Sequence, residues 1–178
     1  MRVGVPIFNR EEEVVQGSQI RKAGDIIEIK RIFYPTDLLG YAYHVLAYVL
    51  LMLEKHDSEV YLLYVARGLH HYTGFQVPHT SISAFMKEAL EGAGKLMDRI
   101  CDRHLHGWFI FRRKVLVGDP GHEIVKTIES ENIDLVIMGS HGRKRPERTL
   151  FGSVAQYVVR HSPMPVLVVT PHRLKERQ

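Results

Sequence analysis

Residues 133–154 read IDLVIMGSHGRKRPERTLFGSV, and they begin as an apolar run that ends abruptly at glycines. The run 135–140 has the composition of a buried strand, and a helix pattern opens at Gly152-Ser153. A basic loop joins the two segments. Taken alone, these residues are consistent with a flexible loop and with a phosphate-binding loop, so the choice depends on the elements on either side.

Strand-like and helix-like segments alternate around this stretch. The strand segments are rich in apolar and β-forming residues. Their alternation with helices predicts an α/β fold, in which an open five-stranded parallel sheet carries helices on both faces. The predicted strands cover residues 29–35, 59–65, 108–117, 135–140 and 165–170.

Four helices are predicted between these strands. The second is expected to be capped by Ser81 or Ser83 and to bury an apolar stripe that includes two methionines as core residues. The third has Asp119 as its expected N-cap and Pro120 at its first helical position. The first helix covers residues 37–56 and the fourth 153–161, and residues 66–80 are predicted to be a long connection.

The composition is that of one soluble globular domain. The chain has 178 residues, of which 45% are apolar and 25% charged. The net charge of +4 is too small to indicate nucleic acid by itself and is compatible with an anionic ligand. Residues 1–28 do not follow the alternation and are predicted to be an N-terminal extension, whereas residues 29–178 are predicted to form the domain.

The sequence predicts a cytoplasmic protein without membrane association. No secretory signal is apparent at the N-terminus. The longest apolar run, residues 41–53, is shorter than the roughly 20 residues that span a bilayer. The single cysteine, Cys101, excludes an internal disulfide and a cysteine-cluster zinc site, and it fits a reducing compartment.

The candidate ligand site lies at the carboxyl ends of the strands, because open parallel sheets bind ligands there, where the strand order reverses. Residues 35–37, Gly118 and the stretch after Met138 occupy such positions. Gly139 and Gly142 would let backbone N–H groups approach an anion and would permit positive φ. Ser153 is expected to cap a helix whose N-terminus attracts phosphate. These surroundings fit phosphate binding and an ordinary solvated basic loop about equally well.

The spacing of Gly139, Gly142 and Gly152-Ser153 resembles the nucleotide-binding signature of the universal stress protein family. The segments IKRIFYPTD, VGDPGHEIV, DLVIMGSHGR and GSVAQYVVRHSPMPVLVV also resemble that family, and the resemblance covers roughly residues 28–170. It implies an adenine nucleotide alpha hydrolase-like fold with strand order 3-2-1-4-5. It also implies binding of ATP, with or without Mg²⁺, and a role as a nucleotide-dependent switch or sensor.

The resemblance further implies roles for individual residues. Asp37 would hold the ribose or the adenine, over a turn formed by Pro35 and Thr36, and Val65 and Met138 would give the adenine apolar contact. The ribose and phosphates would be surrounded by Val117, Gly118, Gly139, His141, Gly142, Gly152, Ser153 and Val154, with Arg143 as a phosphate neighbour. One departure from the family is Leu38-Leu39-Gly40, where relatives usually carry small polar residues.

Binding is predicted rather than efficient catalysis. The chain has no Gly-x-x-x-x-Gly-Lys-Ser/Thr motif, and no carboxylate in the signature loop is obviously placed to activate water. A slow ATPase or nucleotidyl-transfer enzyme that uses the same pocket is one alternative, and a module that binds a small metabolite is another. Nucleic-acid binding through residues 143–148 is disfavoured because no aromatic residues are interleaved there. His104 and His106 are not spaced to share one helical face as metal ligands.

A homodimer is expected through the last strand. Residues Pro165 to Thr170 are apolar and lie at a predicted sheet edge, which tends to pair or to be covered. The resemblance implies the same pairing across a two-fold axis. It also implies a protein partner, of unknown identity, that responds to ATP occupancy.

Overall fold

The computed structural model describes residues 28–38, 42–67, 79–105, 111–141 and 151–170. The predicted N-terminal extension, apart from Glu28, lies outside these residues, as do Gly142 and Arg143. The division of the chain into an extension and a domain therefore stays a prediction.

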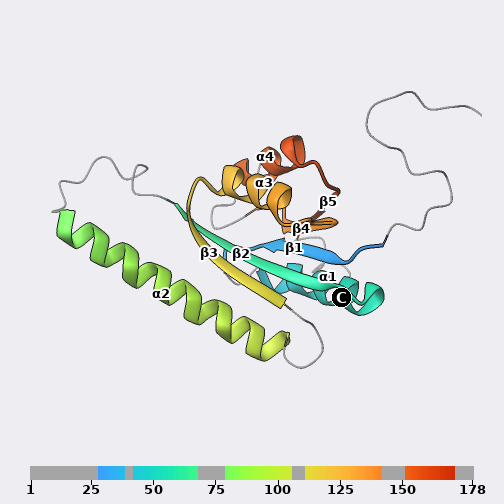
Figure 1. Cartoon of the computed structure of the whole chain (residues 1–178), viewed down its shortest axis with the longest axis horizontal. Coiled ribbons are helices and arrows are strands. Elements are labelled where there is room, and N and C mark those ends of the chain that lie inside the picture. Colours follow the sequence, from blue (N-terminus) through green and yellow to red (C-terminus); the bar gives the residue numbers. More distant parts are fainter. Residues whose placement is uncertain (1–27, 39–41, 68–78, 106–110, 142–150, 171–178) are drawn as a thin grey trace, which may run out of the picture.

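Five parallel strands form one sheet in the order β3-β2-β1-β4-β5, which confirms the predicted fold class and strand order (Figure 1). β1 lies at the centre and pairs with β2 on one side and β4 on the other. The two edges of the sheet are β3 and β5. The strands are β1 (Arg31–Pro35), β2 (Glu59–Arg67), β3 (Phe111–Gly118), β4 (Leu135–Gly139) and β5 (Val166–Val169).

Helices cover both faces of the sheet. α1 (Ala42–His56) and α2 (His79–His104) lie on one face, and α3 (Pro120–Ser130) and α4 (Ser153–His161) on the other (Figure 1). Successive strand residues point to opposite faces, so Ile32 packs under α1 and α2 while Phe33 packs under α3 and α4. Both faces of the central strands are therefore buried, which explains why these strands are continuous apolar runs.

The two longest helices begin elsewhere than the sequence predicted. α1 starts at Ala42 rather than residue 37, because Thr36 to Leu38 form a turn in which Leu38 has a φ of 60°. α2 starts at His79, inside the predicted connection, so Ser81 and Ser83 lie within its first turns and are not its N-cap. The available sequence signal was Pro78, which is tolerated ahead of a helix but not within one.

Other predicted features of the helices are confirmed. α2 buries the second half of the expected apolar stripe, with Met97 fully enclosed in the core beside Cys101, whereas the side chain of the other methionine, Met86, is not among the described ones. Asp119 caps α3 by accepting a hydrogen bond from the His122 backbone N–H at 3.1 Å, and Pro120 is its first helical residue. None of the helices in the described ranges has the length and apolarity that crossing a bilayer requires.

Candidate functional site

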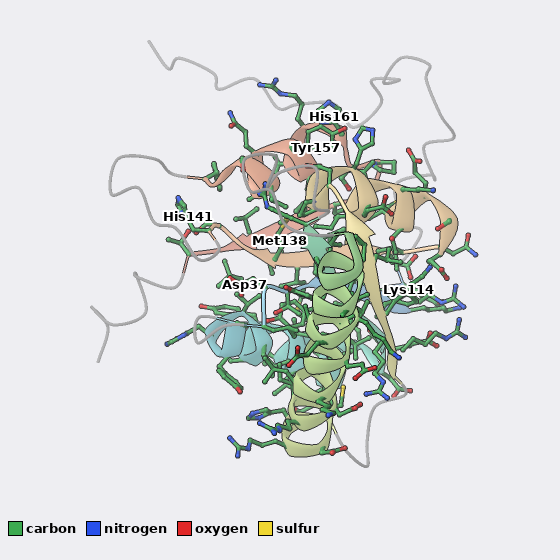
Figure 2. The ribbon with its side chains drawn as sticks, turned by 90° about the vertical axis from the view of Figure 1, so that its left-hand side faces the viewer. Asp37, Lys114, Met138, His141, Tyr157 and His161 are labelled. Atoms are coloured by element: carbon green, nitrogen blue, oxygen red, sulfur yellow. The ribbon has the colours of Figure 1, made fainter. Side chains whose placement is uncertain are left out.

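The candidate site lies where β1 and β4 end side by side. Ile32 pairs with Leu135 and Phe33 with Val136, so the chain leaves the two strands at the same edge of the sheet. Here the strand order reverses, because β1 leads to β2 on one side while β4 and β5 lie on the other. Figure 2 shows Asp37, Met138 and His141 on the side of the molecule at which the strands end.

The turn after β1 holds Asp37 in a defined position. The Thr36 backbone N–H donates to the Leu63 carbonyl at 2.9 Å, and the Thr36 hydroxyl accepts from the Leu38 backbone N–H at 3.1 Å. The Leu38 side chain is buried among core residues, and this burial fixes the position of the turn. Asp37 lies between these two fixed residues and is half-buried. Thr36 and Leu38 thus shape the turn, which follows directly on Pro35, the last residue of β1.

The apolar residues assigned to the adenine and ribose differ in their exposure. Met138 is buried in the core beneath α3 and α4, and Val65 is half-buried against the same cluster. Val117, at the end of β3, leaves 45% of its surface exposed. The next residue, Gly118, is covered by the Glu123 side chain, whose Cγ would lie 2.9 Å from a Cβ at that position.

Ser140 links three elements at this edge, although the sequence did not single it out. It is fully buried, and its backbone N–H donates to the Val169 carbonyl of β5 at 2.8 Å. Its carbonyl accepts from the Gly152 N–H at 2.8 Å, which ties the end of β4 to the start of α4. Its hydroxyl lies 3.1 Å from Nδ1 of His141. The only sequence signal for this role is its place directly after a buried strand.

Two predictions about the glycines and Ser153 are wrong. Gly139 does not have a positive φ, because β4 runs to this residue and pairs it with Val169. Gly152, not Ser153, is the N-cap of α4, with an extended φ of −71° and no side-chain capping bond. Ser153 is the first helical residue and is exposed, and Val154 follows it half-buried. The first turn of α4 therefore has no side-chain cap.

A buried tyrosine, Tyr34, fixes the start of α1 next to the candidate site. The Tyr34 hydroxyl donates to the Ala42 carbonyl at 2.7 Å, which fastens the first residue of α1 to β1. Burial raises the pKa of Tyr34 far above its usual range, so the hydroxyl stays a neutral donor. Within the described ranges, no cluster of three or more histidine, cysteine or acidic residues is arranged to hold a metal ion.

Comparison with known proteins identifies the family and the fold. The profile described as "Universal stress protein family" matches residues 28–170. Universal stress protein MJ0577 of Methanocaldococcus jannaschii is 34% identical over 152 residues, which cover 79% of this chain and 94% of that protein.

Solved structures of the family superpose on this chain. The structure of MJ0577 has a TM-score of 0.72 at 32% identity, over 81% of this chain and 97% of that one. UspA from Lactobacillus plantarum has a TM-score of 0.70 at 22% identity and covers 80% of this chain and 98% of its own. A universal stress protein solved in complex with cAMP has a TM-score of 0.51 at 18% identity, over 80% of this chain and 97% of that one.

Proposed function

The chain belongs to the universal stress protein family, and we propose that it binds ATP where β1 and β4 end and acts as a nucleotide-dependent regulatory protein. The observation that carries the proposal is that Asp37, His141 and the start of α4, which has no side-chain cap, all lie at the edge of the sheet where β1 and β4 end. The glycine spacing of the family's ATP-binding members, present here as Gly139, Gly142 and Gly152-Ser153, supports the same ligand.

The chemistry of this edge fits an adenine nucleotide. The first amides of α4 have no side-chain acceptor at Gly152, and a phosphate would satisfy them and the positive end of the helix dipole. The Asp37 carboxylate is an acceptor, which suits a ribose hydroxyl or the adenine amine. Donors at one end and an acceptor at the other match a ligand with an anionic and a neutral end.

Each of the remaining residues would serve one part of that ligand. Val65, Val117 and Gly118 would border the nucleoside, and Met138 would form the apolar floor. Gly139, His141, Gly152, Ser153 and Val154 would border the phosphates, joined by Gly142 and Arg143 from outside the described residues. Bound ATP would bring a concentrated negative charge, with or without Mg²⁺, to a chain of net charge +4.

A switch rather than an efficient enzyme is the second part of the proposal. Fast phosphoryl transfer needs a positioned nucleophile and preorganised charge on the γ-phosphate. Asp37 is assigned to the nucleoside end, which is away from that phosphate. Turnover is therefore expected to be slow and incidental, and ATP occupancy would change how the chain meets a protein partner.

Calorimetry with ATP and mass spectrometry of nucleotide released from the purified chain test this proposal. We expect micromolar affinity, lowered about 10- to 100-fold in Asp37→Ala, because a hydrogen bond to a charged group is lost. Asp102→Ala, on the exposed surface of α2, is the matched control and should bind as the wild-type chain does.

Two results would contradict the proposal that the chain is an ATP-binding regulatory protein. Undetectable ATP binding, or recovery of a different metabolite, would favour the metabolite-binding module. ATP turnover of about 1 per second or faster, lost in Asp37→Ala, would favour an enzyme.

A further inference from the structure

We propose that residues 1–27 of the N-terminal extension cover the outer ridge of α1 in the same copy of the chain. The outer ridge consists of Tyr43, Ala47 and Leu51, which follow one another at four-residue intervals and so line one side of the helix. Neither the proposed function nor the family resemblance assigns a role to this ridge or to the extension.

α1 is apolar on the side that faces away from the core as well as on the side that packs into it. Residues 42–53 include no acidic residue, lysine or arginine. On the outer ridge, 41% of the surface of Tyr43 and 56% of that of Leu51 are exposed, and Ala47 between them is exposed too. The Tyr43 ring meets His104 of α2 edge-on, so Leu51 is the more open end of the ridge. A helix that is apolar all round is normally covered all round, and the ridge therefore indicates a further contact.

The described chain begins beside the last turns of α1. The Ser58 backbone N–H donates to the Leu53 carbonyl at 3.3 Å, and the Ser58 hydroxyl donates to the Ile29 carbonyl. Ile29 also packs against the core cluster that contains Leu53, on the face of the sheet that α1 covers. Figure 1 shows the start of β1 and the end of α1 at the same end of the molecule. The point at which the extension joins the domain therefore lies next to the helix whose ridge is exposed.

The extension has the length and the composition that covering this ridge requires. α1 has 15 residues and is about 22 Å long, whereas a chain of 27 residues can reach about 90 Å when it is extended. Apolar residues recur throughout the extension, at Val3, Val5, Ile7, Phe8, Val14, Val15, Ile20, Ile26 and Ile27. The C-terminal segment 171–178 reads PHRLKERQ, and half of its residues are charged, which does not suit an apolar ridge. The N-terminal segment is thus the better occupant of the two ends of the chain.

Burial of Leu51 would be the main force that holds the extension. Ordering a segment costs conformational entropy, so only the part that contacts the ridge needs to be ordered. An uncovered apolar ridge would promote association between chains, and the cover would prevent it. A charge at position 51 should therefore release the extension, because a lysine cannot be buried there without a partner.

The first experiment places the photo-crosslinking residue p-benzoylphenylalanine at position 51 of the full chain. Mixing nitrogen-14 and nitrogen-15 chains distinguishes links within one copy from links between copies, as read by mass spectrometry of the linked peptides. We expect links from position 51 to residues 1–27 of the same copy. The control carries the probe at Val159, which is 50% exposed on α4 on the opposite face of the sheet, and should give no such links (Figure 1).

The crosslinking result has two outcomes that would overturn the proposal. Links from position 51 to a second copy would show that the ridge is an interface between copies. Absence of links to residues 1–27 would show that the extension does not lie on the ridge. The experiment uses no nucleotide, so its result is independent of the proposed function.

The second experiment measures how fast trypsin cleaves the extension of the native full chain at Arg10, Arg21 and Lys22. Leu51→Lys should raise these rates about 10-fold, because the burial that holds the extension is lost. Val159→Lys is the matched control and should leave the rates unchanged. Equal rates in the wild-type chain and Leu51→Lys would overturn the proposal. An equal increase in both variants would overturn it too, because Val159 is not part of the ridge.

Discussion

Leu38 shows how the surroundings of a single residue hold it in a conformation that it does not favour. A leucine with a φ of 60° is strained by about 1–2 kcal/mol relative to the right-handed region. Burial of its side chain and the hydrogen bond from its N–H to Thr36 offset that cost. The sequence drew attention to Leu38-Leu39-Gly40 as a departure from the polar residues of relatives. In the structure Leu38 has an apolar role, since it fastens the turn that carries Asp37.

Cys101 is predicted to be unreactive while the chain is folded. Burial raises the pKa of its thiol from 9.0 to about 11, so little of the nucleophilic thiolate forms at neutral pH. We expect a thiol reagent to label Cys101 in urea and to leave it unmodified in native buffer, as followed by mass spectrometry. Rapid native labelling that is independent of unfolding would contradict its burial.

The same pKa predicts how stability changes with pH. Between pH 9 and about pH 11 the unfolded chain loses the thiol proton and the folded chain keeps it, so unfolding becomes easier as pH rises. The free energy of unfolding of the wild-type chain should fall by up to about 2 kcal/mol more than that of Cys101→Ala across this window. Parallel curves for the two chains, from urea unfolding at each pH, would contradict the assignment.

At the scale of the elements, α3 packs closely on α4 at Gly121, whereas Gly94 of α2 lies on a part of that helix with open space beside it. A Cβ at Gly121 of α3 would lie 2.8 Å from Cδ1 of the Tyr157 ring on α4. That ring is held from both sides, because its hydroxyl is 2.7 Å from Nδ1 of His122 and its face stacks on His161 at 4.1 Å. Figure 2 shows Tyr157 and His161 together on this part of the molecule. Gly94 of α2 has open space where its Cβ would be.

Two glycine-to-alanine substitutions should therefore have opposite effects. Gly94→Ala should stabilise the chain by about 0.5–1 kcal/mol, since alanine is the better helix former and nothing obstructs it. Gly121→Ala should destabilise it by about 1–3 kcal/mol, because the Tyr157 ring must move. Urea unfolding measures both. Equal changes in the same direction would show that helix propensity, not the packing of α3 on α4, decides the result.

At the scale of the whole molecule, the two edges of the sheet differ in character. β3 carries Arg112, Arg113 and Lys114, all exposed, and charged edge strands resist pairing. β5 is short and apolar, and 36% of the surface of Leu167 is exposed on it. The molecule therefore has one edge suited to association. The family resemblance implies that a second copy of the chain pairs there.

Homodimer formation through β5 stays a prediction, and light scattering tests it. Leu167→Lys should shift the wild-type dimer toward a monomer, because a lysine on an edge strand opposes pairing. Leu51→Lys is the matched control, since Leu51 is 56% exposed on α1 and is not part of the edge strand, and it should leave the dimer intact. A monomeric mass for the wild-type chain, with and without ATP, would contradict the prediction.

By itself the sequence determined the α/β class, the five strands and the edge that carries the candidate site. These follow from local pattern, because apolar runs, helical periodicity and proline or glycine positions are read over a few neighbouring residues. The Asp119 cap was predictable for the same reason, since an N-cap bond spans only three residues. The strand order came from the family resemblance, and the structure confirms it.

Only the tertiary structure decided the details of the candidate site. Gly139 lies in extended backbone because it pairs with Val169, and Ser140 is buried because residues from β5 and α4 close over it. Leu38 keeps a positive φ because core residues hold its side chain. Each of these states depends on partners remote in the sequence. Local propensity contributes about 1 kcal/mol or less per residue, so those distant contacts override it.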